Sequence, residues 1–150
     1  MASRLVIGVG NDYRGDDAVG LHVARLLRAE GLGGVVVREM QGDGTSLVEI
    51  WQGAETVVLA DAVVSGAEPG FVHRFDARAR SLPAHVFSPS STHAFGVAEG
   101  VELARQLNRL PERLIVYGIE GKDFRAGALM TPEVEKAAAG VVEYILEDLR

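Results

Sequence analysis

Apolar positions along the chain follow two alternating patterns. Short runs rich in β-branched residues predict strands, which fall at residues 4–9, 35–40, 56–61 and 114–119. Apolar positions at helical spacing predict helices, which fall at residues 17–30, 45–52, 94–107 and from Pro132 to the C-terminus. Such alternation of strands and helices is typical of an α/β layered protein with a mostly parallel sheet.

Individual residues indicate how some of these elements begin. Thr45 is expected to cap the short second helix through its hydroxyl group, and Pro132 after Thr131 suits the first position of the last helix. Residues 71–75 alternate between apolar and polar positions, which predicts a half-exposed strand. No long linker separates the predicted elements, so we expect one domain that spans residues 1–150.

Composition narrows the classes of function. The 150 residues carry a formal net charge of −6 without a cluster of Lys and Arg, so binding to nucleic acid is not expected. The apolar runs are too short to cross a bilayer and no signal peptide is visible, which favours a cytoplasmic protein without membrane insertion. Cys is absent, which excludes disulfides, thiolate metal ligands and a cysteine nucleophile. The net charge also favours a monomer.

The loop after the first predicted strand is rich in glycine and acids. Ligands of open parallel sheets bind beyond the carboxyl ends of strands, and in this loop Asp16 and Asp17 come directly before a predicted helix. The two acids suit capping of that helix, and they equally suit a functional site. A dinucleotide-binding G-x-G-x-x-G loop is the alternative, in which Tyr13 replaces the third glycine and Glu39 could bind a ribose.

Two further polar residues lie at predicted loop positions of the same kind. Asp61 ends the third predicted strand, and His93 comes just before the predicted helix at 94–107. Asp61 alone is explained equally well by a turn or a cap, and a single His before a helix is usually a cap or a surface residue. With Asp17 they would supply two carboxylates and one imidazole, a ligand set that holds divalent transition metals without thiolates. Three protein ligands also leave coordination positions open for a substrate.

Motifs spread along the chain resemble those of the hydrogenase maturation proteases, the endopeptidases that process the large subunit of nickel-iron hydrogenases. The motifs are GVGN at 8–11, DDAVG at 16–20, VLADA at 58–62, THAFG at 92–96 and YGIEG at 117–121. Their order and gaps agree with the family across residues 4–145. The resemblance implies a three-layer α/β sandwich, in which a twisted, mostly parallel sheet of about five strands has helices on both faces.

The resemblance also implies a reaction, a partner and a site. Members of the family remove a C-terminal extension from the large-subunit precursor after nickel insertion, so this precursor is the expected partner and Ni²⁺ is expected to arrive with it. The metal ligands of the family fall on Asp17, Asp61 and His93. The first ligand is often glutamate in the family, and Asp17 is one methylene shorter. Other divalent metals are expected to fit the same ligands.

Several mechanisms are compatible with these residues. Metal-assisted hydrolysis would polarise the scissile carbonyl or activate a bound water, with Asp16 as the candidate catalytic base or as a group that supports the ligands. A serine mechanism would use a hydroxyl at residues 90–92 beside His93, although no nucleophile-elbow motif surrounds them. Alternatively, the ligands hold the precursor's nickel transiently, as a check on its insertion. Outside the family, a non-catalytic metal- or nucleotide-binding α/β module remains the alternative.

Overall fold

A computed structural model describes residues 3–41, 44–87 and 95–150 of the chain. The strands are β1 (Arg4–Val9), β2 (Val35–Met40), β3 (Thr56–Val63), β4 (Val72–Asp76) and β5 (Arg113–Glu120). The α-helices are α1 (Val19–Ala29), α2 (Leu47–Ile50), α3 (Val97–Gln106) and α4 (Pro132–Asp148). Two short 3₁₀-helices, η1 (Gly15–Ala18) and η2 (Gly44–Ser46), precede α1 and α2. The predicted order of strands and helices is confirmed.

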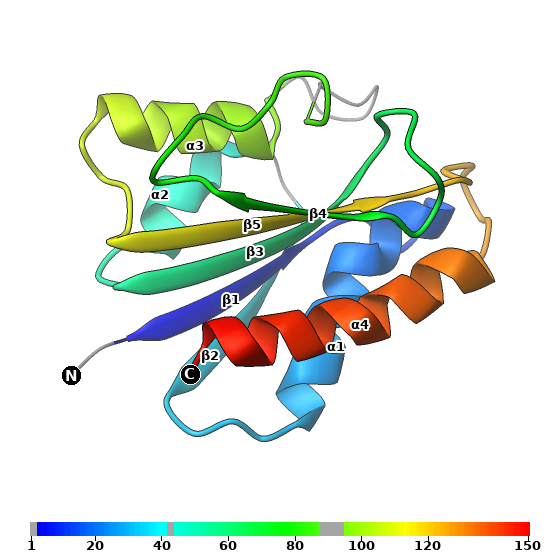
Figure 1. Ribbon diagram of the computed structural model, residues 1–150, viewed down its shortest axis with the longest axis horizontal. Helices are drawn as coiled ribbons and strands as arrows, with labels where there is room; N and C mark the ends of the chain where they lie inside the picture. The colour runs from blue at the N-terminus through cyan, green and yellow to red at the C-terminus, as the bar shows by residue number, and fades with distance from the viewer. Residues whose placement is uncertain (1–2, 42–43, 88–94) are drawn as a thin grey trace.

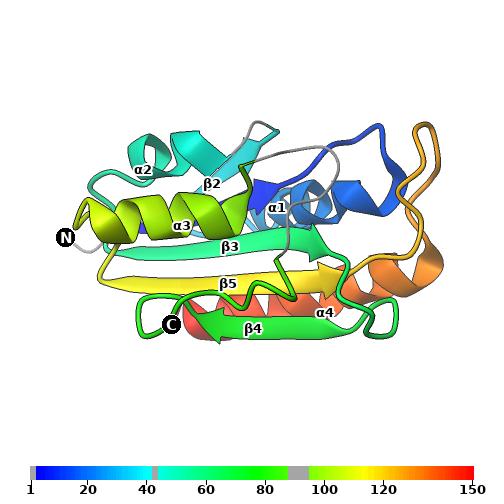
Figure 2. The ribbon, with the colours of Figure 1, turned by 90° about the horizontal axis from the view of Figure 1, so that it is seen from above.

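The strands form one five-stranded sheet in the order β2-β1-β3-β5-β4. β2, β1, β3 and β5 are parallel, whereas β4 runs antiparallel to β5 at the edge of the sheet. The parallel strands therefore all end on one side of the molecule, toward the right in Figures 1 and 2. The half-exposed strand predicted around residues 71–75 is β4, whose alternation fits an antiparallel edge strand.

Helices cover both faces of the sheet (Figure 1). On one face α2 and α3 pack against alternate strand residues, such as Ile7 and Leu59. On the other face α1 and α4 pack against the intervening residues, such as Val6 and Val58. Because successive side chains of a strand point to opposite faces, each buried strand contributes to both apolar cores. The predicted three-layer sandwich with a mostly parallel sheet is confirmed.

A polar cluster holds the C-terminal end of α4 against the sheet. Asp148 is almost fully buried and accepts a hydrogen bond from the Tyr117 hydroxyl. It also pairs with Arg74 of β4 at 2.5 Å and with Arg113 of β5 at 3.4 Å. Two cations at the C-terminus of a helix complement its dipole. Figure 1 shows that this end of α4 lies far from the carboxyl ends of the parallel strands.

Three local predictions need correction. β3 continues to Val63, so Asp61 lies inside the strand, because β5 keeps pairing with β3 as far as Glu120. The helix predicted to start at Asp17 begins as the 3₁₀-helix η1 and becomes regular at Val19. Ser46 stands at the N-cap position of α2 in place of Thr45.

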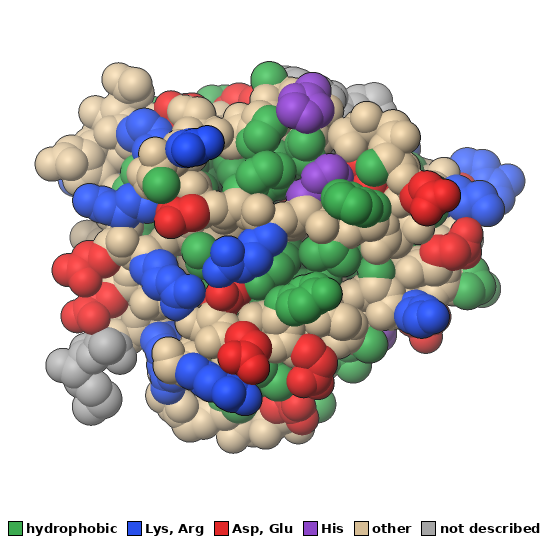
Figure 3. Space-filling model, in the orientation of Figure 1, with side chains coloured by type: hydrophobic (Ala, Val, Ile, Leu, Met, Phe, Trp, Pro, Cys, Tyr) green, Lys and Arg blue, Asp and Glu red, His purple; other side chains and the backbone are tan. Residues whose placement is uncertain are grey.

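Two observations concern the length of the helices and the distribution of charge on the surface. None of the described helices is long and apolar enough to cross a membrane. Figure 3 shows Lys and Arg side chains interspersed with Asp and Glu over the face that carries α4 and β4. A mixed surface of this kind offers no continuous basic stripe to a phosphate backbone on that face.

Candidate active site at the carboxyl ends of the strands

Asp61 lies in β3, one residue beyond Ala60, which pairs with Gly8 near the end of β1. It alternates with Leu59 and Val63, both of which belong to the core beneath α2 and α3, so its side chain lies on the α3 face. Its partner across the neighbouring strand β5 is Gly118, which has no side chain. The space over Gly118 is filled by the side chains of Phe87 and Val63, each of which a Cβ there would meet at 3.1 Å.

A close approach of α1 to the sheet brings Asp17 to the same place. A Cβ on Gly20 would lie only 2.1 Å from the carbonyl oxygen of Val9 and 2.4 Å from that of Ala60. Only glycine allows the start of α1 to sit this close to the ends of β1 and β3. The DDAVG motif therefore places η1, and Asp17 within it, over the carboxyl edge of the sheet.

The backbone on both sides of Asp17 is held by the first loop. Its N–H donates to the carbonyl oxygen of Arg14 at 3.1 Å, and its own carbonyl accepts from the N–H of Asn11 at 3.2 Å. A Cβ on Gly10 would lie 2.1 Å from the same carbonyl, so the GVGN motif permits this contact. The half-buried carboxyl group thus extends from a fixed stretch of backbone.

The two acids interact electrostatically. Burial, and secondarily the negative charge of Asp17, raise the pKa of the Asp61 carboxyl from 3.8 to about 8. Like charges that are held near each other favour uptake of a proton or a cation. The structure therefore brings together two of the three predicted metal ligands as an acidic pair.

The third predicted ligand, His93, lies outside the described residues. The residues that follow it are anchored, because the N–H of Gly44 donates to the carbonyl of Phe95 at 2.8 Å. The N–H of Gly96 donates to Glu99 at 2.6 Å, which fixes the start of α3 at Val97. Among the described residues no group of three His, Asp or Glu side chains could hold a metal. The ligand set of Asp17, Asp61 and His93 therefore stays a prediction.

Asp16 points away from Asp17 and into the protein. It is fully buried, and its carboxylate accepts hydrogen bonds from the backbone N–H groups of Lys122, Asp123 and Thr131 at 2.7–3.0 Å. The Thr131 hydroxyl donates to it as well, at 3.0 Å. Asp16 does not cap the helix that follows it, as the capping interpretation expected, because its carboxylate is bound to the loop before α4, up to the N-cap residue Thr131. Its predicted role as a catalytic base stays untested, whereas these contacts fit a supporting role.

Glu120 is a buried acid that the sequence showed only as part of the YGIEG motif. Its carboxylate accepts hydrogen bonds from the backbone N–H and the hydroxyl of Ser65. The Nε2 atom of His73 lies 3.2 Å away. These contacts fasten the loop between β3 and β4 to the end of β5. An acid at the carboxyl end of a buried strand was the feature that could have identified it, as it did Asp61.

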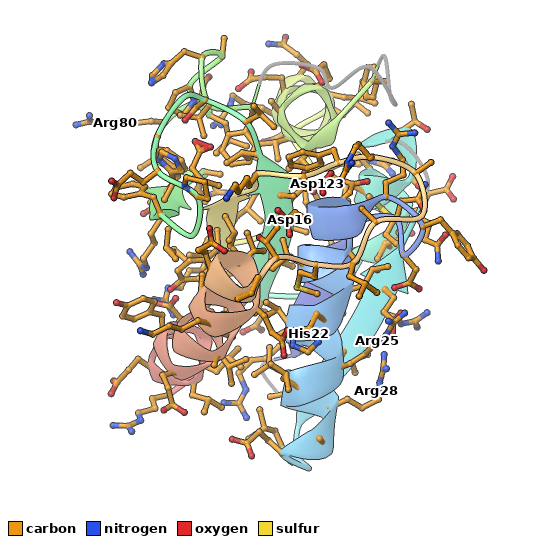
Figure 4. All side chains as sticks on the ribbon, turned by 90° about the vertical axis from the view of Figure 1, so that its right-hand side faces the viewer. Asp16, His22, Arg25, Arg28, Arg80 and Asp123 are labelled. Carbon is orange, nitrogen blue, oxygen red and sulfur yellow. The ribbon has the colours of Figure 1, made fainter. Side chains whose placement is uncertain are left out.

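Glu39, the candidate ribose-binding acid of the dinucleotide interpretation, is already bound to other side chains. Glu39 forms ion pairs at 2.8 Å with Arg25 and Arg28, two side chains of α1 that lie along the outer surface in Figure 4. Arg25 also pairs with Asp12 in the first loop at 2.9 Å. These arginines lower the pKa of the Glu39 carboxyl and hold it against α1. These ion pairs hold the first loop, α1 and β2 together.

The fold and the acidic pair together define an α/β protein with its functional site at the carboxyl ends of parallel strands. Comparison with known proteins specifies the family. Residues 33–148 match the family model described as hydrogenase maturation protease. The chain therefore belongs to the hydrogenase maturation protease family, and it is a hydrogenase maturation endopeptidase.

Individual relatives are similar to this chain over nearly its full length. Protein FrxA of Pyrococcus furiosus is 31% identical over 140 residues, which are 91% of this chain and 97% of that protein. The Hydrogenase 2 maturation protease of Escherichia coli is 27% identical over 149 residues, covering 97% of this chain and 90% of that one. The solved structure of the NiFe hydrogenase maturation protease HybD from Thermococcus kodakarensis is 26% identical, with 98% of each chain covered and a TM-score of 0.70.

Proposed function

We propose that this endopeptidase removes the C-terminal extension of a nickel-iron hydrogenase large-subunit precursor after nickel insertion, and that Asp17, Asp61 and His93 recognise the nickel. The observation that carries the proposal is the pairing of Asp17 with Asp61 at the carboxyl edge of the sheet. The enzyme would act as a cytoplasmic monomer, as its sequence favours.

The chemistry of these side chains supports nickel as the cargo that is recognised. Carboxylate oxygens and an imidazole nitrogen suit a divalent transition ion. Three protein ligands leave positions for groups that the precursor itself supplies. In the empty site burial and the charge of Asp17 keep a proton on Asp61, and a divalent cation held by both carboxylates would displace that proton. This property suits a check on nickel insertion, since the ion is delivered by the substrate.

The hydrolytic step needs a substrate held in place and a water able to attack it. Nickel of the precursor would polarise the scissile carbonyl or lower the pKa of a bound water. The contribution of the chain is to hold Asp17 and Asp61 in fixed positions, because a misplacement of about 1 Å can cost about 100-fold in rate. The fixed backbone around Asp17 meets that requirement.

The loops at this edge also carry apolar side chains that face solvent. Tyr13 follows β1, Val64 and Phe71 flank the turn between β3 and β4, and Leu129 precedes α4; their exposed fractions are 76%, 60%, 53% and 88%. Figure 2 shows these three loops at the same end of the sheet. Large exposed apolar side chains around a site are typical of a protein-binding surface. The occupant that we propose is the large-subunit precursor.

The direct test is cleavage of a nickel-loaded cognate precursor by purified variants. Asp17→Asn, Asp61→Asn and His93→Ala should each lower kcat/KM by at least about 100-fold. Asp12→Asn is the matched control, because Asp12 belongs to the same loop and its carboxylate is bound to Arg25 at the surface. Normal cleavage by all three variants would overturn the proposed site. Equal cleavage of nickel-free precursor by the wild type would overturn the proposed role of nickel.

A further inference from the structure

We infer that Asp16 is a positioning residue, whose buried carboxylate ties the turn that carries Asp17 to the loop between β5 and α4 and thereby sets where the Asp17 carboxylate lies. This inference rests on the proposed function, because it takes Asp17 as a nickel ligand. Figure 4 shows Asp16 and Asp123 close together, between the start of α1 and the loop that leads into α4.

The carboxylate of Asp16 connects segments that are far apart in the sequence. One oxygen accepts the N–H groups of Lys122 and Asp123 at 2.8 and 3.0 Å, and the other accepts the N–H of Thr131 at 2.7 Å. The hydroxyl of Thr131 donates to both oxygens at 3.0 Å. A single buried side chain thus binds both ends of the loop at residues 121–131.

Backbone contacts reinforce the same junction. The N–H of Asp16 donates to the carbonyl of Asp123 at 2.8 Å, and the N–H of Gly127 donates to the carbonyl of Tyr13 at 2.7 Å. Gly15 has a φ of +57°, and a Cβ there would lie 2.2 Å from the carbonyl oxygen of Asp123. The first loop and the loop at 121–131 therefore pack against each other as one unit.

The position of Asp17 depends on this unit. Asp17 is the next residue in the 3₁₀-helix η1, and its backbone is bound to Arg14 and Asn11 of the first loop. Release of Asp16 would free one side of η1 while the other side stayed attached to the sheet. Groups that hold metal ligands in place typically contribute 10- to 100-fold to metal affinity when they are intact. Asp16 is therefore expected to affect nickel binding without touching the ion.

The hydrogen-bonding pattern predicts which substitution breaks the junction. The groups that surround the Asp16 carboxylate are donors. In Asp16→Asn the amide NH₂ group would face N–H donors and could not accept from them. Thr131→Val is a milder second variant, because it removes the hydroxyl and retains both the backbone N–H and a β-branched side chain.

Asp148→Asn is the matched control for lost stability. Asp148 is also a buried acid that accepts several hydrogen bonds, and it lies at the opposite end of α4 from Thr131. Each variant is compared by its free energy of unfolding in urea, its dissociation constant for Ni²⁺ in calorimetry, and its kcat and KM on nickel-loaded precursor. A role in stability alone would change the metal affinity of both Asp→Asn variants equally.

We expect Asp16→Asn to weaken Ni²⁺ binding at least about tenfold and to lower kcat, and Thr131→Val to do the same to a smaller extent. Asp148→Asn should leave the Ni²⁺ affinity unchanged at a comparable loss of stability. Equal Ni²⁺ affinity for Asp16→Asn and Asp148→Asn overturns the inference. If Asp16→Asn does not fold, unchanged Ni²⁺ affinity in Thr131→Val overturns it instead.

A parallel measurement on Asp17→Asn separates this inference from the proposed function. Loss of Ni²⁺ binding in Asp17→Asn together with wild-type affinity in Asp16→Asn rejects only the positioning role. Wild-type affinity in Asp17→Asn rejects the nickel site itself, and the positioning role with it.

Discussion

The carboxyl groups of Asp17 and Asp61 interact across the gap between η1 and β3, and the charge of Asp17 adds to the effect of burial in raising the pKa of Asp61. Neither η1 nor β3 alone would create this relationship. It arises because the start of α1 packs directly on the ends of β1 and β3 at Gly20. The acidic pair is therefore a property of the fold and leads to a testable dependence on pH.

The contribution of Asp61 to the stability of the metal-free protein should decrease as pH rises from 3.8 to about 8. Asp61 has a raised pKa in the folded state, so in this range the folded protein holds a proton that the unfolded chain has released. The free energy of unfolding therefore falls with pH, by at most about 1.4 kcal/mol per pH unit from this group. Urea unfolding of wild type and Asp61→Asn in the presence of a chelator measures the slope. Parallel plots of unfolding free energy against pH for the two proteins would contradict the prediction. Asp17→Asn removes one of the two causes of the raised pKa of Asp61, so its plot should lie between the other two.

Binding of Ni²⁺ to the free enzyme should release a proton and tighten as pH rises toward 8. A cation requires both carboxylates in their charged form, whereas Asp61 retains its proton at neutral pH because of its raised pKa. Calorimetry in two buffers with different ionisation enthalpies gives the number of protons released. Asp61→Asn should release fewer protons than the wild type. A heat of binding that is independent of the buffer would argue against coupling between metal and proton.

Substitution of Glu120 should loosen the loop between β3 and β4. Glu120→Gln replaces one acceptor oxygen by a donor group opposite the N–H and hydroxyl of Ser65, so we expect a loss of about 2 kcal/mol in the free energy of unfolding. Proteolysis within residues 64–71 should become faster. Glu68→Gln, at an exposed position of the same loop, is the control and should change neither measurement. Wild-type stability in Glu120→Gln would show that these bonds contribute little.

The close packing of α1 on the sheet should not tolerate a methyl group at Gly20. In Gly20→Ala the new Cβ would overlap the carbonyl oxygens of Val9 and Ala60, so helix and strands must separate at a cost of at least about 3 kcal/mol. Gly140→Ala in α4 is the contrasting control, because a Cβ there meets nothing within 4 Å. It should raise the stability by about 0.5–1 kcal/mol through helix propensity. Equal effects of the two substitutions in urea unfolding would contradict this packing.

The exposed apolar residues of the carboxyl edge should contribute to binding of the precursor and not to the stability of the fold. Leu129→Ser and Phe71→Ser are expected to raise KM on the nickel-loaded precursor about tenfold each, with kcat and stability little changed. Leu107→Ser, at a similarly exposed position after the C-terminal end of α3, serves as the control. An unchanged KM in both edge variants would place the precursor on another surface.

The sequence predicts most of the fold because the pattern of apolar residues reflects burial in each element. The succession of strands and helices along the chain, the helix faces and the region of Asp17 and Asp61 follow from periodicity and from the rule that sites form at strand ends. The partners of Asp16 could not be predicted, because Lys122 and Thr131 lie 106 and 115 residues away along the chain. The longer β3 was also missed, because its continuation beyond Asp61 depends on pairing with β5, a strand about 50 residues away along the chain.

The junction at Asp16 has a consequence for the order in which the enzyme becomes competent. Asp16 is synthesised early, while the N–H groups that it binds belong to residues made near the end of translation. Contacts of such large sequence separation close late, because the entropy of a long loop must be overcome first. A nascent chain that has formed β1, α1 and β3 would therefore have both acids but no fixed geometry for them. Competence for precursor processing would then arrive only when the last loop and α4 have docked.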